Sequence, residues 1–173
     1  MKKFCITFLA LTIIFLSLNF CGCDLQKKEY LRIHIRANSN LRVDQDIKME
    51  VKDLLVEFLT PYLVDIHSKE KAISFLKSNL KKMEELTNEF LTKSGFNYSS
   101  KVLLRSEKFP TRIYGNLTLE EGIYDALIVE LGSAEGNNWW CVVYPPLCFV
   151  NCGTNYVYKS KILEIINNFF KKI

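Results

Sequence analysis

The segment NNWWCVVYPPLCFVN, residues 137–151, constrains the fold most, because it reads as a strand that must stop abruptly. Trp139 and Trp140 are adjacent, so on a strand their side chains point to opposite faces of the sheet and each needs its own cover. Pro145 and Pro146 lack amide donors and fix their own φ, so they end the ladder and favour an extended exit path. The segment is interpreted either as core, with both indoles buried, or as a proline-braced binding surface.

The chain begins with the features of an export signal. Two lysines, Lys2 and Lys3, precede an uncharged run from Phe4 to Cys23. A positive segment followed by an apolar core is typical of a secretory signal, and this core approaches the roughly 20 residues that span a bilayer. We therefore expect residues 1–23 to be a signal peptide or signal anchor and residues 24–173 to be an exported domain.

Three fates are open for this leader. It can be cleaved, or it can be retained as a membrane anchor through residues 4–23. It can also be lipidated at Cys23, because the sequence FCGC, residues 20–23, loosely resembles a bacterial lipobox with phenylalanine in place of the usual leucine. In each case the positive end stays inside, so we expect the domain to be secreted or extracytoplasmic and to contact a membrane only through its leader.

The charge balance argues against a nucleic-acid partner. Without Lys2 and Lys3, the 23 basic residues fall to 21, against 19 acidic residues. A DNA or RNA binder would carry a basic stripe or a known motif, and the sequence has neither. The roughly 150 residues after the leader suffice for one domain with its own core.

Hydrophobic periodicity predicts a strand and then two helices. Leu31 to Ala37 alternates between apolar residues and the polar Arg32, His34 and Arg36, as in a strand with one face in the core and one polar face. Asn38, Ser39 and Asn40 offer turn and cap oxygens, and apolar spacings of three and four then predict a first helix that ends near Pro61 to Ile66. A second helix is predicted to begin at Ser68, as N-cap, and to end near Gly95.

The remainder predicts strands and a final helix. Strand patterns cover residues 101–105, 122–131 and 139–144, with a break at Pro110 and a turn at Gly115 and Asn116, and a last helix runs from about 158 to 170. Short links between consecutive strands favour an antiparallel meander. The predicted fold class is α+β: a single two-layer domain with an antiparallel sheet, in the order strand, two helices, strand meander and C-terminal helix.

Three of the six cysteines follow the leader: Cys141, Cys148 and Cys152. Export permits a disulfide, and Cys141 with Cys148 across the two prolines is the geometrically plausible pair, with Cys148 and Cys152 left as an open alternative. Free, buried thiols are the ordinary alternative.

The enzyme hypothesis is weak. A cysteine nucleophile needs a base, and the chain has two histidines, of which His34 is the better placed for a dyad with Cys141. That dyad, in an extracytoplasmic thiol-dependent hydrolase, is the alternative function. The cysteines lack the paired spacing of structural zinc sites, and the sequence holds no phosphate-binding glycine loop, HExxH or GxSxG. We expect no catalytic residues, no metal and no cofactor.

Three segments carry a resemblance to a known family. LRIHIRANSNLRVDQDIKMEVKD (31–53), FPTRIYGNLTLEEGIYDALIVELG (109–132) and GNNWWCVVYPPLCFV (136–150) resemble the stage II sporulation protein R family of endospore-forming bacteria. The resemblance covers nearly all of the exported domain.

The resemblance implies a developmental signal. Such a protein is made in the forespore, is exported into the space between the forespore and mother-cell membranes, and activates a membrane-embedded aspartic protease. That protease, stage II sporulation protein GA, processes the precursor of the early mother-cell sigma factor. The residues predicted to contact it are aromatic, proline-braced or basic: Trp139, Trp140, Tyr144, Pro145, Pro146, Arg32, His34 and Arg36.

Overall fold

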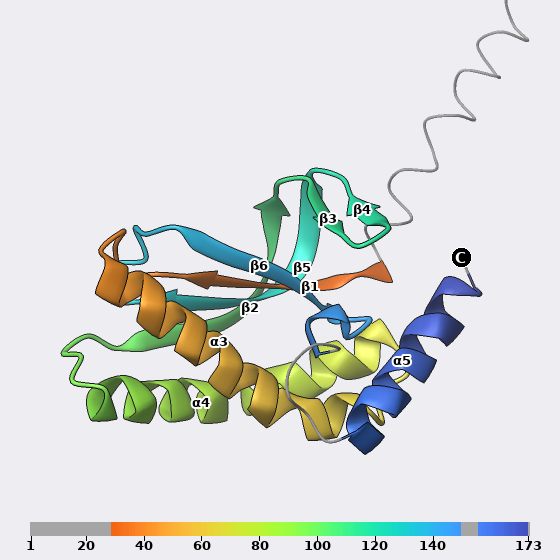
Figure 1. Cartoon of the computed structure of the whole chain (residues 1–173), viewed down its shortest axis with the longest axis horizontal. Helices are drawn as coiled ribbons and strands as arrows, with labels where there is room; N and C mark the ends of the chain where they lie inside the picture. The colour runs from red at the N-terminus through yellow and green to blue at the C-terminus, as the bar shows by residue number, and fades with distance from the viewer. Residues whose placement is uncertain (1–28, 150–155, 173) are drawn as a thin grey trace, which may run out of the picture.

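The computed structural model describes residues 29–149 and 156–172. The leader with Cys23, and Cys152, lie outside the described residues. The elements are β1 (Leu31–Arg36), α3 (Arg42–Leu63), α4 (Lys69–Lys93), β2 (Ser100–Phe109), β3 (Arg112–Tyr114), β4 (Leu117–Leu119), β5 (Gly122–Leu131), β6 (Asn138–Tyr144), the 3₁₀ turn η1 (Leu147–Phe149) and α5 (Tyr156–Phe170), as Figure 1 shows.

The predicted α+β class is confirmed, but the sheet is mixed. Its strand order is β2-β5-β1-β6, with β1 parallel to β5 and antiparallel to β6. The expected meander is therefore wrong in one place, because β1 lies between β5 and β6. The two inner strands, β1 and β5, are buried along most of their length, as central strands must be. The two helices after β1 supply the crossover that a parallel pair requires.

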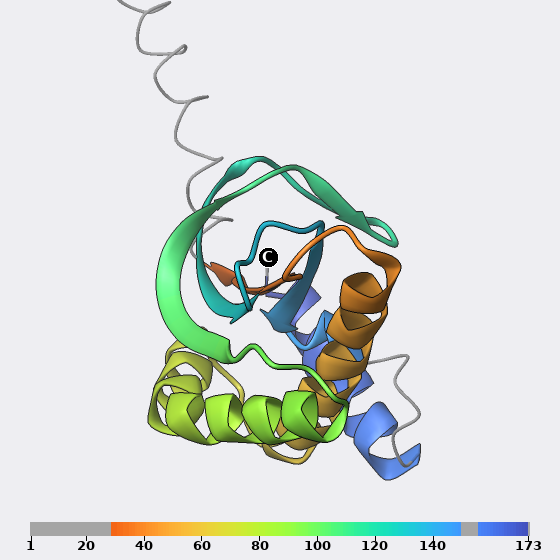
Figure 2. The ribbon, with the colours of Figure 1, turned by 90° about the vertical axis from the view of Figure 1, so that its left-hand side faces the viewer.

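The inner strand β1 is covered on both faces of the sheet: by helices on one face, and on the other by the sheet's own strands β2 and β5 where they curve over. Helices α3 and α4 lie along one face, on the side opposite the β3–β4 hairpin in Figure 1. Figure 2 shows β2 and β5 curving away from that layer and continuing into the β3–β4 hairpin, which arches over β1 and β6. We call this curved ribbon, residues 100–131, the arch. The sheet therefore has a helix face and an arch face, and β1 is covered on both.

The two predicted helices are confirmed with small shifts of their ends. The stripe Ile47, Val51, Leu55 and Leu59 of α3 is buried, and Pro61 lies in the last turn of the helix, which continues to Leu63. Their spacing of four puts these residues on one side of the helix, facing the sheet.

The ends of α4 follow ordinary capping chemistry. The Ser68 hydroxyl accepts a hydrogen bond from the Lys71 amide at 3.3 Å, as predicted for an N-cap. Gly95 has φ +83° just after the C-cap, a left-handed conformation that glycine adopts without a Cβ penalty.

The connection between β1 and α3 is fixed by one buried carboxylate. Asp44 accepts hydrogen bonds from the Ser39 hydroxyl at 2.6 Å, the Asn38 amide at 2.9 Å and the Tyr98 hydroxyl at 2.7 Å. These hydrogen bonds hold the pKa of Asp44 below its usual value although burial opposes the shift.

In residues 29–149 and 156–172, no helix has both the length and the hydropathy to cross a bilayer.

Candidate functional site

The polar residues of β1 lie under the arch rather than on the surface. Arg32 is 0% exposed and His34 is 1% exposed, whereas Arg36 is partly exposed. The expectation of an open basic patch is therefore wrong for Arg32 and His34. Alternation correctly separated the two faces of the strand, but the second face is covered by the arch, which comes from a distant part of the chain.

Aromatic rings surround the Arg32 guanidinium. Its carbon Cζ lies 4.3 Å from the ring centre of Phe109, 4.9 Å from that of Tyr124 and 5.8 Å from that of Tyr114. Nη2 donates a hydrogen bond to the Tyr114 hydroxyl at 2.9 Å, while Nε and Nη1 have no hydrogen-bond partner. Burial lowers the pKa of Arg32, but the guanidinium remains a cation because its ordinary pKa is so high.

His34 is sandwiched between aromatic side chains. Its ring is stacked on Trp140 with centroids 3.6 Å apart and meets the edge of Phe109 at 5.8 Å. Neither imidazole nitrogen makes a well-formed hydrogen bond, and Nδ1 lies 3.9 Å from Glu107 Oε1. Burial, reinforced by the charge of Arg36, lowers the pKa of His34 to about 4, although the adjacent Asn138 side chain acts in the opposite direction.

Arg32, His34 and Arg36 form a row along β1, called here the basic row. Acidic residues lie near its partly exposed end, at Arg36. Arg36 pairs with Glu107 and, at 3.2 Å, with Glu130, while Arg105 lies 3.1 Å from Glu130 and 3.5 Å from Glu107. The carboxylates therefore compensate Arg36 and Arg105. They do not form an ion pair with Arg32, which lies at the other end of β1.

The two tryptophans divide between the faces of the sheet. Trp140 is opposite His34 and points under the arch, where the Arg112 guanidinium lies 5.7 Å from its ring. Trp139 is opposite Ile35, so it belongs to the helix face. Both indoles are half-buried and pack against the core. Each therefore contributes to the core, as in the first interpretation, and keeps some exposed surface, as in the second.

The two prolines are buried and do not form part of the surface. Tyr144, Pro145 and Pro146 are buried, and the Tyr144–Pro145 peptide bond is cis. The chain then forms η1 instead of the expected extended exit, and Phe149 is buried in the core. Of the predicted binding residues in this segment, the two tryptophans alone keep part of their surface exposed.

Cys141 and Cys148 are joined by a disulfide that ties β6 to η1, with Cα atoms 5.9 Å apart. Cys141 is opposite Ile33 and faces the helices, whereas His34 faces the arch, so the predicted Cys141–His34 dyad is not formed. His67 is exposed in the α3–α4 connection. Among the side chains that the structure describes, no group of three or more histidine, cysteine or acidic residues could hold a metal ion.

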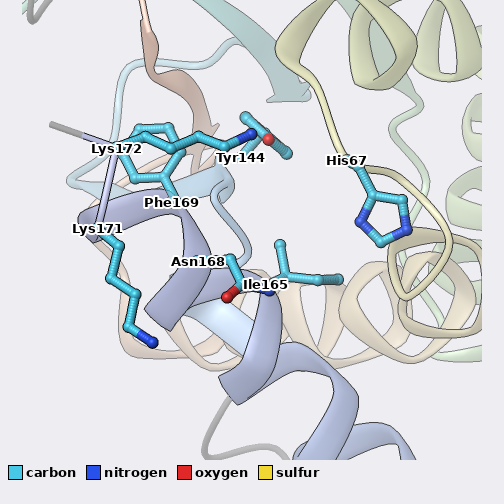
Figure 3. A pocket seen from close by; sticks show the side chains of 7 residues that line it. All are labelled: His67, Tyr144, Ile165, Asn168, Phe169, Lys171 and Lys172. Atoms are coloured by element: carbon cyan, nitrogen blue, oxygen red, sulfur yellow. The ribbon is translucent and has the colours of Figure 1, made fainter.

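A pocket of about 410 Å³ lies beside Tyr144, between the end of β6, the α3–α4 connection and α5. Figure 3 shows His67 on one wall and the residues of α5 on the other. Its lining combines aromatic, aliphatic, amide and basic side chains: His67, Tyr144, Ile165, Asn168, Phe169, Lys171 and Lys172. Tyr30, which precedes β1, packs on Phe169 with ring centroids 5.4 Å apart.

The sequence did not indicate the side chains that enclose Arg32 and His34. Phe109, Tyr114 and Tyr124 come from three strands of the arch, and Glu107 comes from β2. The available signal was Glu107 and Phe109 at alternate positions of β2, together with Tyr124 in β5. It became informative only once the curvature of the arch brought these positions over β1.

Comparison with known proteins decides the family. The model of the family described as "Stage II sporulation protein R (spore_II_R)" matches residues 27–154. The chain belongs to the stage II sporulation protein R family. It is 35% identical over 131 residues to the stage II sporulation protein R of Bacillus subtilis (strain 168), a match that covers 76% of this chain and 58% of that protein. No solved structure shows significant similarity. β1, the arch and β6 all lie within residues 27–154, so Arg32, His34 and the side chains that enclose them belong to the matched region.

Proposed function

We propose that this member of the stage II sporulation protein R family is an exported signal that activates a membrane-embedded aspartic protease during sporulation. The protease of the proposal is stage II sporulation protein GA, and its substrate is the precursor of the early mother-cell sigma factor. The single observation that carries the proposal is the family match over residues 27–154, which supports a role in sporulation. The match spans 58% of the length of the Bacillus subtilis relative, so the activity of the whole protein is part of the proposal.

The geometry of the domain is consistent with a binding protein. The Cys141 sulfur is engaged with Cys148, and His34 lies on the opposite face under Trp140. A thiol hydrolase built on Cys141 and His34 would need a free thiolate within hydrogen-bond reach of the imidazole, and neither condition is met.

The proposed location is the space between the forespore and mother-cell membranes, reached through the leader. The support is the pair of lysines before an uncharged run, Phe4 to Cys23. A domain in that space meets the outer face of a membrane protease without crossing a bilayer itself.

The proposed contact surface is the start of β6. Trp139 and Trp140 are large, partly exposed and held by the sheet, the disulfide and the buried prolines. Such pre-organised aromatic residues lose little entropy on docking and are enriched at binding hot spots. Arg36, the partly exposed member of the basic row, lies opposite Asn138 and extends the same surface.

The proposal is tested by co-expression in a non-sporulating cell. This chain, the protease and the sigma precursor are produced together and in each pairwise combination, and precursor cleavage is followed by immunoblot. Cleavage that depends on this chain supports activation. Equal cleavage without it contradicts the proposal.

A further inference from the structure

Arg32 is a fully buried cation without a buried counterion. Arginine is seldom fully buried unless an acidic group pairs with it, because removing the charge from water is costly. In residues 29–149 and 156–172 the acids nearest the basic row pair with Arg36 and Arg105, and no carboxylate forms an ion pair with Arg32. The nearest hydrogen-bonding partner is neutral, the Tyr114 hydroxyl.

Two N–H groups in the plane of the Arg32 guanidinium have no hydrogen-bond acceptor. The rings of Phe109 and Tyr124 lie within 5 Å of Cζ and stabilise the cation through their faces. Cation–π contact does not satisfy N–H groups, and the Nε and Nη1 donors have no acceptor. A planar, singly charged acceptor with two oxygens would supply both the missing negative charge and the missing hydrogen bonds.

We propose that Arg32 is a carboxylate-binding residue in a site that the β3–β4 hairpin covers. The ligand is a carboxylate, either free or carried by an acidic side chain of a peptide. The proposal does not depend on the protease partner proposed above, because it follows from the unpaired charge alone.

The hairpin provides the route of entry. Ladder pairing between β2 and β5 ends at Phe109 and Gly122, and pairing between β3 and β4 begins only at Arg112 and Leu119. Residues 110–111 and 120–121 form a joint between the two ladders, which the Thr111 hydroxyl bridges by accepting from the Glu121 amide at 3.0 Å. A tilt at this joint would carry Tyr114 away from Arg32 and free Nη2 as well.

A second cation moves with the hairpin. Arg112 lies over the Trp140 ring at 5.7 Å, and its charge contributes to lowering the pKa of Arg32. A carboxylate bound at Arg32 would remove this repulsion, so the ligand would hold the hairpin in place rather than expel it. Arg32 would supply the buried donors and Arg112 the charge at the entrance.

The test is thermal unfolding of the full chain in a mild non-ionic detergent at constant ionic strength. Sodium chloride is replaced stepwise by sodium acetate, and in a second arm the end-blocked tripeptide Gly-Glu-Gly is added, with end-blocked Gly-Gln-Gly as control. A ligand that binds only the native state should raise the Tm by about 3–6 °C at ten times its Kd. A rise with acetate and with Gly-Glu-Gly indicates a site open to free carboxylates, and a rise with Gly-Glu-Gly alone indicates one that requires a peptide.

Matched variants assign the effect to Arg32. Arg32→Met should abolish the rise, whereas Arg42→Met, which removes an equally charged but exposed side chain, should retain it. Tyr114→Phe removes the competing hydroxyl and should preserve or enlarge the rise. If Arg32→Met does not fold, the Arg Nε–H NMR signals of the unmutated protein are titrated with acetate, and a solvent-protected signal must shift and saturate. No rise in either arm, an equal rise with Gly-Gln-Gly, or an unshifted protected signal would overturn the proposal.

Discussion

His34 of β1 and Trp140 of β6 lie face to face, with ring centroids 3.6 Å apart and planes 20° from parallel. Phe109 meets both rings at their edges, at 5.8 Å from His34 and 4.8 Å from Trp140. The stack joins the edge strand to the middle of the sheet and to the arch, and Phe109 connects it to the hydrophobic core.

The first prediction concerns the unequal roles of the tryptophans in stability. Trp140 contacts His34, Phe109 and Arg112, so Trp140→Ala should lower the free energy of unfolding by about 3 kcal/mol. Trp139→Ala should cost less than about 1.5 kcal/mol. Denaturant unfolding of the two alanine variants measures both values. Equal losses would show that the stack does not distinguish the two residues.

The second prediction concerns pH. In the folded protein the pKa of His34 is lowered to about 4, against an ordinary value of 6.5, so between these values the unfolded chain binds more protons. Stability should therefore be full above about pH 6.5 and should decline as the pH falls toward 4.

The His34→Gln variant provides the control for this window. It should flatten the pH dependence between 4.5 and 6.5, whereas His67→Gln, which changes an exposed histidine, should leave it intact. Asp44 and Asp125 have pKa values lowered below the ordinary value of an aspartate, so the stability that they contribute is lost mostly below the pH window of His34. A decline that persists unchanged in His34→Gln would rule out this assignment.

The third prediction concerns the disulfide. Mass spectrometry of the non-reduced protein should find the Cys141 and Cys148 peptides linked, two hydrogen atoms lighter than after reduction. Because the bond closes a short loop of seven residues, the double variant Cys141→Ser and Cys148→Ser should lose about 2 kcal/mol of stability. Free thiols at both positions in the exported protein would refute the bond.

The fourth prediction concerns export. A reporter enzyme that is active only outside the cytoplasm, fused after Ile173, should be active. Replacing Ile13 and Ile14 by arginine should abolish that activity, because each charge costs about 2.5–3.5 kcal/mol at the centre of a bilayer. Replacing Leu163, an exposed apolar residue of α5, by arginine is the control and should leave export unchanged. A silent reporter with good expression would contradict the export signal.

The sequence predicted the individual helices and strands better than it predicted which strands pair with each other. The helices, the Ser68 cap, the turn at Gly95 and the strand at β6 follow from spacing, capping and proline chemistry within short windows. The position of β1 between β5 and β6 depends on pairings across about 100 residues, and the tendency of consecutive strands to be neighbours gave the wrong partner.

The same limit applied to the candidate site. Alternation placed Arg32 and His34 together on one face, as the structure confirms, but it could not show that the arch covers that face. A Cys141–His34 dyad requires that the strands of the two residues be neighbours. The strands are indeed paired, and the register, which no local pattern fixed, sends the two side chains to opposite faces.

The most direct measurement is precursor cleavage in a non-sporulating cell that produces this chain, the proposed protease and the sigma precursor. We expect cleavage only when all three are present, loss of cleavage with folded Trp139→Ala, and full cleavage with the matched surface variant Arg42→Met. Cleavage that proceeds equally in the absence of this chain would contradict the role of the protein as the activating signal.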